Sequence, residues 1–407
     1  MEGTVDQSGA PRIGPGQYKD AYDASTIPRY YRITRTPGST VTASIATIVR
    51  PYPSQNAETW TLTLATPDGT ECATSRVTSS TLSSTTVLGG AVSSSQVDLY
   101  SRSPAPEPCT TDPELMLSLS RSSWMGNTDD IAVEVLIAEE PPIRNLASLP
   151  DPIGDYDGKA DAVRPGRSAG SRLGGTSFSN STEVTPGTWR DSVAVAETVF
   201  YRVRLEHGQR LRVTAITPAP KTPSQLTAAE WVTTRVNIFS PARVSLTEQK
   251  ANFTSNQAVL VTAASPEVRA RNREMPSPPS FLDPTVTTAS VAGDYFVGLQ
   301  LDPLGRLLWG RVMQVQLSLA IDGKVSGQPE YATSTSQSPT PTPSGTVGSA
   351  DPTGAPTAGA TPPPTQQGSS AWPGLVLAAA GLFALGMAVG ALAWRRRSRR
   401  VPPPPGP

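Results

Sequence analysis

Residues 15–45 read PGQYKDAYDASTIPRYYRITRTPGSTVTASI, and residues 186–216 read PGTWRDSVAVAETVFYRVRLEHGQRLRVTAI. In both stretches Pro-Gly precedes an aromatic residue and an aspartate, and a Tyr-Arg pair follows. The matching positions are Tyr18 with Trp189, Asp20 with Asp191, Tyr31 with Tyr201, and further on Trp60 with Trp231. This correspondence indicates two homologous domains in one chain.

Each copy alternates apolar and polar residues with a period of two, which is typical of half-buried β-strands. The clearest pattern, on either side of a turn at residues 206–209, is Val199, Tyr201, Val203, Leu205, Leu211, Val213 and Ala215. The arginines between these positions are expected to face solvent. We therefore predict an all-β protein with two tandem, jelly-roll-like β-sandwiches.

Changes in composition divide the chain into seven segments. We predict a disordered N-terminus at 1–10, a first sandwich at 11–140, a linker at 141–175 and a homologous second sandwich at 176–325. A Pro/Ser/Thr-rich stalk at 326–370, a transmembrane helix at 371–394 and a basic tail at 395–407 follow. The stalk has too few apolar groups to form a packed core, and its prolines favour an extended chain.

The transmembrane prediction rests on residues 371–394, which contain no charged residue and are long enough to cross about 30 Å of hydrocarbon. Trp372 and Trp394 stand at its ends, where indole rings favour the membrane interface. The tail carries Arg395, Arg396, Arg397, Arg399 and Arg400. By the positive-inside rule the tail is cytoplasmic. We expect a single-pass protein of the cell membrane with extracytoplasmic sandwiches.

Export of the sandwiches requires a signal that the opening residues MEGTVDQSGA do not supply. They have neither a basic start nor an apolar run. A start codon placed too late, a signal already removed and insertion from the C-terminal end are the alternatives. We favour a missing signal peptide.

The run Pro-Gly-x-aromatic-x-Asp, then Tyr-Arg-Val-x-Leu and Gly-Gln-x-Leu-x-Val, resembles the bacterial pre-peptidase C-terminal domain. Residues 294–297 resemble the late strand of that family, and the second copy matches better than the first. The resemblance implies a jelly-roll-like accessory module of secreted or surface proteins, suspected in some cases of binding sugar, calcium or protein. It implies no catalytic residue. It also implies kinship with paired modules in actinobacterial membrane proteins.

One histidine, two cysteines and no net charge restrict the chemistry of the chain. Zinc and haem sites, nucleophilic triads and nucleic-acid interfaces draw on His, Cys or excess basic charge. We expect no cofactor, no bound metal, no nucleic-acid partner and no enzymatic activity. Cys72 and Cys109 both lie in the first copy, and outside the cytoplasm we predict a disulfide between them; two reduced, buried thiols are the alternative.

Two polar features are candidate sites. His207 lies in the 206–209 turn, where the first copy has Pro37, so we interpret it as a turn residue rather than a catalytic base. The linker carries carboxylates that could collect calcium, but it lacks the closing glutamate of an EF-hand loop, so a solvated acidic linker is favoured. These carboxylates are Asp151, Asp155, Asp157 and Asp161.

The aromatic residues form a third candidate. If exposed, they would make a sugar-stacking platform, but their positions on alternating strands favour core packing. They are Tyr30, Tyr31, Trp60, Trp189, Tyr201 and Trp231.

Our leading hypothesis is a non-enzymatic, membrane-anchored protein that presents a binding or assembly surface to another cell-envelope protein. Its other partner is the lipid bilayer, through the C-terminal helix. One alternative is a module that binds cell-envelope carbohydrate or peptidoglycan, which requires exposed aromatic residues. Another is a carboxylate-dependent hydrolase, which requires two facing acidic residues.

Overall fold

The computed structural model describes residues 2–23, 26–49, 58–79, 86–95, 105–123, 130–154, 156–218, 232–252, 258–274, 284–303 and 310–332. Both repeat copies lie in one compact unit, Met1–Ser338. In these ranges no helix has the length and hydropathy needed to span a bilayer. The expected stalk from residue 333 onward, the transmembrane helix with Trp372 and Trp394, and the five arginines of the tail lie outside the described residues.

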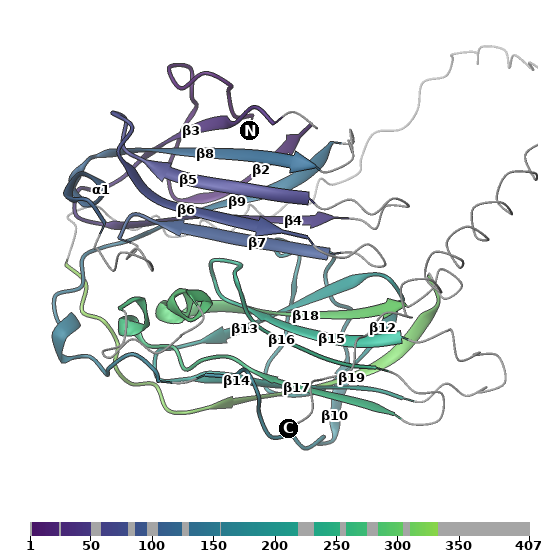
Figure 1. The fold of residues 1–407 in the computed structure, drawn as a ribbon. Coiled ribbons are helices and arrows are strands. Elements are labelled where there is room, and N and C mark those ends of the chain that lie inside the picture. Colours follow the sequence, from purple (N-terminus) through teal and green to yellow (C-terminus); the bar gives the residue numbers. More distant parts are fainter. Residues whose placement is uncertain are drawn as a thin grey trace, which may run out of the picture. The chain divides into compact units, whose positions relative to one another are not determined.

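The first copy forms two sheets that face each other across a core (Figure 1). Sheet A has the strand order β1-β3-β8-β5-β6. Its strands are β1 (Arg12–Ile13), β3 (Arg29–Thr34), β5 (Glu58–Ala65), β6 (Glu71–Thr78) and β8 (Glu114–Ser123). Sheet B has the order β2-β9-β4-β7. Its strands are β2 (Gly16–Tyr22), β4 (Thr40–Val49), β7 (Thr86–Ser93) and β9 (Ile131–Glu140), and a short helix, α1 (Glu107–Thr111), precedes β8.

The second copy repeats this arrangement. Sheet A′ has the order β11-β13-β18-β15-β16 and consists of β11 (Thr182–Glu183), β13 (Thr198–Leu205), β15 (Val232–Phe239), β16 (Ser245–Asn252) and β18 (Gly293–Pro303). Sheet B′ has the order β10-β12-β19-β14-β17. It consists of β10 (Ser168–Ser171), β12 (Gly187–Ala194), β14 (Arg210–Thr217), β17 (Val259–Ala264) and β19 (Val312–Asp322). Short segments of 3-10 helix lie at η1 (Leu146–Ser148), η3 (Ala270–Arg273) and η4 (Pro284–Ser290).

The two copies share one topology, because each strand from β1 to β9 has its counterpart from β11 to β19 at the same place in its sheet. A four-stranded sheet packed on four long strands of a second sheet, with these crossovers, is the jelly-roll arrangement. The prediction of an all-β protein with two sandwiches is confirmed. Strand β10 is the one addition among the described strands of the second copy.

A hydrogen-bonded Asp-Tyr pair explains why the opening repeat motif recurs. Tyr31 donates its hydroxyl to Asp20 Oδ2 at 2.5 Å, and Tyr201 donates to Asp191 in the same way. Each aspartate also accepts a backbone N–H from the segment before the repeat motif, Gly3 in one copy and Gly174 in the other, at 2.9 Å. The aspartate thus fixes an arriving N-terminal segment to β3 or β13.

The prediction that residues 1–10 are disordered is wrong for residues 3–10. Thr4 forms a bridge with Tyr30, as Gly175 does with Phe200, and Ala10 is buried. The segment is ordered because its backbone groups find partners on the sandwich. The repeat therefore begins earlier than the sequence motif suggested, with residues 3–13 corresponding to 174–184.

The expected linker, 141–175, is also part of the second sandwich rather than a free connection. Val163 N donates to Thr214 Oγ1 at 2.7 Å and Gly166 N donates to Thr188 Oγ1 at 3.0 Å, so the chain crosses the outer face of sheet B′. It then enters β10, beside β12. Threonine hydroxyls on that face supply the acceptors that a crossing backbone requires.

The strand register shows that the predicted match of Trp60 with Trp231 is wrong. The turns that follow β5 and β15 match, since Thr66 N donates to Thr70 O and Ser240 N donates to Val244 O. Counting back from these turns places Thr234, not Trp231, at the position of Trp60. Trp231 itself lies outside the described residues.

The two cores differ at one buried charged pair. In the first copy, Arg121 on β8 contacts Glu58 on β5 at 3.0 Å, and both side chains are almost inaccessible to water. Arg121 also donates to the backbone carbonyls of Tyr22 and Asp23. By register the second copy has Leu301 and Val232 at these two positions. The same fold therefore accommodates either an ion pair or an aliphatic pair.

We predict that Arg121→Leu alone lowers the free energy of unfolding by about 3–5 kcal/mol, because Glu58 is then a buried charge without its cation. The double variant E58V/R121L should recover most of this loss, since it copies the second sandwich. Urea denaturation of both variants measures the difference. Equal destabilisation by the single and double variants would contradict this account.

Candidate functional site

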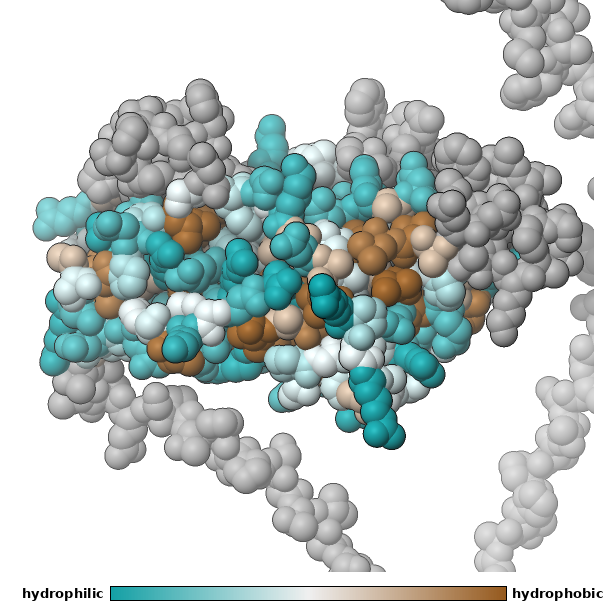
Figure 2. Space-filling view, turned by 90° about the horizontal axis from the view of Figure 1, so that it is seen from below, coloured by the Kyte–Doolittle hydropathy of each residue, from teal (hydrophilic) through white to brown (hydrophobic). Residues whose placement is uncertain are grey.

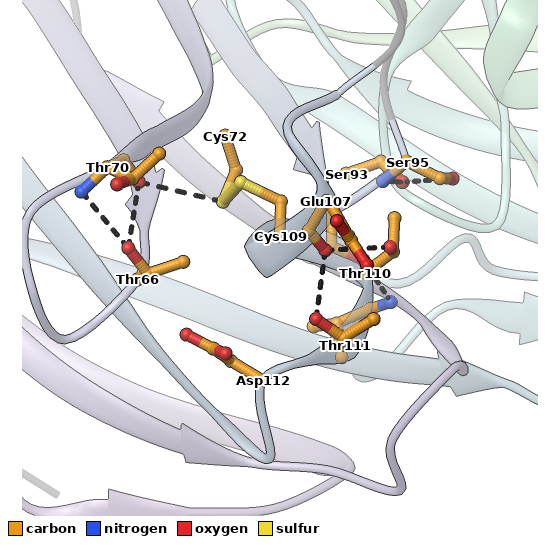
Figure 3. The surroundings of a disulfide bond; sticks show 12 residues. Thr66, Thr70, Cys72, Ser93, Ser95, Glu107, Cys109, Thr110, Thr111 and Asp112 are labelled. Carbon is orange, nitrogen blue, oxygen red and sulfur yellow. Dashed lines mark hydrogen bonds between the residues drawn. A yellow bond between two sulfur atoms is a disulfide. The ribbon is translucent and has the colours of Figure 1, made fainter.

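The predicted disulfide between Cys72 and Cys109 is confirmed, with an Sγ–Sγ distance of 2.06 Å. It ties edge strand β6 to helix α1, and Figure 3 shows around it Thr66 and Thr70 from the turn before β6 and Thr110 and Thr111 from α1. The two cysteines are 37 residues apart. Closing a loop of this length contributes about 4 kcal/mol in the chain-entropy model.

His207 lies in the 206–209 turn as expected, and it is buried, with 4% of its surface exposed. Burial lowers its pKa, against smaller opposing effects of a hydrogen bond to the Ser290 backbone and the negative charge of Glu140. Its Nε2 atom has no hydrogen-bond partner among the described residues. The neutral imidazole is therefore the form that the folded protein favours.

The linker aspartates do not gather in the described part of the chain. Asp151 pairs with Arg271 at 2.6 Å, and Asp157 accepts the Lys159 N–H at 3.0 Å. Asp155 lies outside the described residues. Across the described ranges, no group of three or more His, Cys, Asp or Glu side chains is placed to hold a metal ion.

The aromatic candidates are mainly core residues, as the favoured interpretation held. Tyr31, Trp60 and Tyr201 are 0% exposed and Trp189 is 8% exposed. Tyr30 is half-buried. These buried rings cannot form the sugar-stacking platform considered as the alternative.

A cluster of phenylalanines joins the two sandwiches. The ring of Phe178 lies 4.6 Å from Phe200 and 5.1 Å from both Phe239 and Phe296. Three of these residues come from sheet A′ and Phe178 from the segment before β11. The cluster packs against the outer face of sheet B, on Ala46, Ile48 and Val87. We call this contact the junction.

A buried ion pair and a glycine complete the junction. Arg243, in the β15–β16 turn, is 1% exposed and lies 3.0 Å from Glu134 of β9. Arg243 Nη1 and Glu134 Oε2 form no hydrogen bond, so the attraction between them is coulombic. A Cβ atom on Gly89 of β7 would lie 1.9 Å from the Arg243 carbonyl oxygen. Only glycine permits this approach of two backbones.

A second group of contacts joins β9 of the first sandwich to η3 of the second. Arg273 holds Glu140 through two hydrogen bonds of 2.6 and 3.1 Å, and Tyr331 donates to the same carboxylate at 2.9 Å. A depression of about 340 Å³ opens next to Arg273, and its other lining residues are Thr40, Ser95, Pro141, Pro142, Ile143, Leu146 and Glu274. Arg273 and Glu274 are both ion-paired, the latter with Arg271 at 2.8 Å. The contacts of Arg273 and Tyr331 with Glu140 therefore link the second sandwich and the segment after it to the first sandwich.

The outer face of sheet A carries a regular array of hydroxyl groups. Three cross-strand rows of residues span β8, β5 and β6: Ser118–Thr63–Thr74, Ser120–Thr61–Arg76 and Ser122–Thr59–Thr78. Every position in these rows except Arg76 is a serine or threonine. Thr59 pairs with Thr78 and Thr63 with Thr74, both at 3.1 Å. We call the eight serines and threonines the hydroxyl face.

The same three rows on sheet A′ are charged. They read Gly298–Asn237–Glu248, Gln300–Arg235–Lys250 and Asp302–Thr233–Asn252. Arg235 contacts both Asp302 and Glu248. Across these three rows the first sandwich carries one charged side chain, Arg76, and the second carries four, which are Asp302, Arg235, Glu248 and Lys250.

Sequence reasoning missed the junction and the hydroxyl face. The signal for the face was present in the outward positions of ETWTLTLA and ELMLSLSRSS. Alternation in these strands puts every second residue on one side. Nothing in the sequence pairs Gly89 with Arg243.

Comparison with known proteins finds distant structural similarity alone. The sequence matches no protein-family model, and no curated protein is significantly similar to it. The CBM22 tandem domain of Paenibacillus barcinonensis Xyn10C has 10% identity, covers 76% of this chain and 92% of its own, and has a TM-score of 0.19. The tandem CBM51 modules of the Streptococcus pneumoniae family 98 glycoside hydrolase Sp3GH98 have 10% identity, coverage of 73% and 83%, and a TM-score of 0.21.

A chain of Broad Bean Stain Virus has 9% identity, coverage of 73% and 78%, and a TM-score of 0.18. Similarity at this level bears neither on ligand nor on activity.

Gly89→Ala should uncouple the sandwiches, because the added methyl group meets a backbone atom that no side-chain rotation can move. Overpacking of this kind costs about 1–3 kcal/mol or more. We expect calorimetry to resolve two unfolding transitions in place of one. The control is Leu260→Ala, at the equivalent position of β17 where the side chain is half exposed. A single transition in the Gly89 variant would contradict a coupled junction.

The buried His207 should make stability depend on pH. Because burial lowers its pKa, protonation favours the unfolded chain. This contribution is complete above the usual histidine value and is lost as pH falls from about 7 to about 5. Urea denaturation should show a shallower loss over this window for His207→Gln. Parallel pH profiles for the variant and the natural chain would show that His207 does not carry the effect.

Proposed function

We propose that this protein is a non-enzymatic, membrane-anchored extracytoplasmic protein whose hydroxyl face is an assembly surface for a cell-envelope protein. The face itself is the observation that carries the proposal. Its side chains are short, uncharged and partly hydrogen-bonded to one another. A second surface can approach these eight side chains without desolvating a charge, since the charged side chain in the rows, Arg76, lies on the edge strand β6.

The junction supports the same proposal. It packs the two sandwiches together in one compact unit and covers part of the outer face of sheet B and part of sheet A′. Sheet A is not part of this contact. Sheet A′ uses its outer face for the junction, whereas the homologous sheet A keeps its hydroxyl face outside this contact. The hydroxyl face is therefore suited to binding a partner.

The compartment is proposed on two grounds. A disulfide is favoured in oxidising environments outside the cytoplasm. The apolar segment 371–394, with Trp372 and Trp394 at its ends and Arg395 to Arg400 beyond, has the composition of a single-pass anchor with a cytoplasmic tail. We also propose kinship with pre-peptidase C-terminal domains, on the recurring Asp-Tyr pair and strand pattern.

Orientation is tested with single cysteines, since the two natural ones are paired and no described cysteine is free. Val325→Cys, at a position that is 50% exposed and outside the hydroxyl face, should react with a membrane-impermeant maleimide on intact cells. Ser398→Cys should react only after lysis. The reverse pattern would place the sandwiches in the cytoplasm and reject the proposed compartment.

Use of the hydroxyl face is tested with matched arginine substitutions. Thr59→Arg places a long cation on the face, and Thr233→Arg places one at the homologous position of sheet A′. After crosslinking of intact cells, we expect Thr59→Arg to reduce the complex containing this protein at least about tenfold, since a desolvated cation costs several kcal/mol. Thr233→Arg should leave it intact. Equal effects of both variants would reject the face as the binding surface.

A further inference from the structure

After the last strand of the second sandwich, the chain runs back to the first sandwich. Residues 323–332, which we call the exit strap, follow β19 and end beside residues 142–145. Two backbone hydrogen bonds of 2.7 and 2.8 Å join the strap to these residues, on either side of a bridge between Ile143 and Tyr331. The Tyr331 hydroxyl also donates to Glu140, at the end of β9. The exit strap therefore contacts both sandwiches.

The other end of the strap packs on the turn that contains His207. Ser326 N donates to the His207 carbonyl oxygen at 3.0 Å. A Cβ atom on Gly208 would lie 2.4 Å from the Lys324 carbonyl oxygen, and one on Gly323 would lie 2.1 Å from the Gly208 carbonyl oxygen. Both glycines have positive φ, 81° and 87°, and the two backbones leave no room for a side chain between them. A movement of this turn therefore moves the strap.

Hydrogen bonds rather than core packing hold the strap in place. It continues β19, the central strand of sheet B′, and Figure 2 views the molecule from the side of this sheet, where hydrophobic residues reach the surface among hydrophilic ones. The strap adds no buried residue, since every residue from 323 to 332 is exposed or half-buried. A segment with few buried apolar contacts opens at a lower free energy than core strands do. The strap can therefore detach while both sandwiches stay folded.

His207 is the titratable group in the turn that holds the strap. Its side chain is buried and hydrogen-bonds to the Ser290 backbone of η4, but Nε2 has no partner among the described residues. Glu140 is the carboxylate on the first sandwich that acts on the ring. Both oxygens of Glu140 already accept hydrogen bonds from Arg273, and one also accepts the Tyr331 hydroxyl. The positive charge of Arg273 opposes a second cation beside it.

The carboxylates on the other elements around this turn are paired as well. Glu206, in the turn itself, contacts Arg204 at 3.2 Å. Glu267, in the segment packed on the turn, contacts Arg269 at 2.8 Å. The strap contributes a positive charge, Lys324. Burial therefore outweighs the nearby carboxylates and lowers the pKa of His207, so the ring is neutral while the strap is closed.

We propose that acid releases the exit strap: a proton on His207 Nε2, which finds no acceptor in the closed arrangement, detaches residues 323–332 from the turn and from residues 142–145. Release lets Nε2 reach water and ends the contact of the strap with Glu140. The ten freed residues add up to roughly 30 Å of extended chain between the second sandwich and whatever follows residue 332. This inference goes beyond the assembly surface and does not rest on it.

Amide hydrogen exchange on the detergent-solubilised full chain, at about pH 7.5 and about pH 5, tests the proposal. The amides to follow are those of Ser326 and Ala332 in the strap and of Arg144 beside it, each of which donates to a backbone carbonyl when the strap is closed. After correction for the intrinsic exchange rate, their protection should fall about tenfold at the lower pH. The upper bound is about 30-fold, set by the pKa of about 6.5 of a free histidine.

The matched variant is His207→Gln, which is uncharged at both pH values. The protection of its strap amides should change less than about twofold. The internal reference is the Gly38 amide, which donates to Thr110 O in the homologous turn, where Pro37 takes the place of histidine. Equal falls in the variant and the natural chain would overturn the proposal, as would unchanged protection in the natural chain. A fall of the same size in the core amides of β13 and β14 would show general unfolding and would also overturn it.

A disulfide across the strap gives a second test that leaves His207 in place. Ile143 and Tyr331 face each other between two backbone hydrogen bonds, in a narrow antiparallel pair whose Cα atoms are about 4.5 Å apart, which suits a disulfide. In oxidised I143C/Y331C, the Arg144 and Ala332 amides should keep their protection at the lower pH. Reduction of the engineered disulfide should restore the fall. A fall of equal size in the oxidised and reduced forms would show that strap separation does not cause it, and would overturn the proposal.

Discussion

The close approach of the Arg243 carbonyl to Gly89 is the constraint on which the arrangement of the two sandwiches depends. Two backbones meet there without an intervening side chain, so the turn that carries Arg243 reaches deep enough to place its guanidinium beside Glu134. The phenylalanine cluster then excludes water around the pair, which strengthens the attraction between the charges. This contact covers part of one outer face of each sandwich, sheet B in the first and sheet A′ in the second. The outer faces of sheets A and B′ do not take part in it.

Comparison of the two copies shows which features both jelly rolls share and which belong to one copy. Both copies keep the Asp-Tyr pair that secures the N-terminal segment, and both keep a glycine with φ of 81° after β3 and β13, Gly38 and Gly208. The buried Arg121–Glu58 pair, the disulfide and the hydroxyl face belong to the first copy alone. These are additions to a shared frame, and the outer faces are where the copies differ in charge.

Alternating hydrophobicity and the repeat were sufficient to predict the fold class, the two sandwiches and the burial of Tyr31, Trp60 and Tyr201, because side-chain period and core packing are local consequences of sequence. The disulfide followed from the count of cysteines and the expected compartment. Order in residues 3–10 was not predictable, since it depends on Asp20, far along the chain. The junction was not predictable for the same reason, because no sequence pattern connects Gly89 in the first sandwich with the Arg243 carbonyl in the second.

Amide hydrogen exchange on the full-length protein tests the coupled arrangement most directly, because exchange reports local opening in free-energy terms. If the junction holds, amides of β7 around Gly89 and of the turn at residues 240–244 exchange as slowly as those of the adjoining core strands, and the Gly89→Ala variant releases both together. Exchange at these amides as fast as in exposed loops would show that the two sandwiches open independently, and would contradict the account.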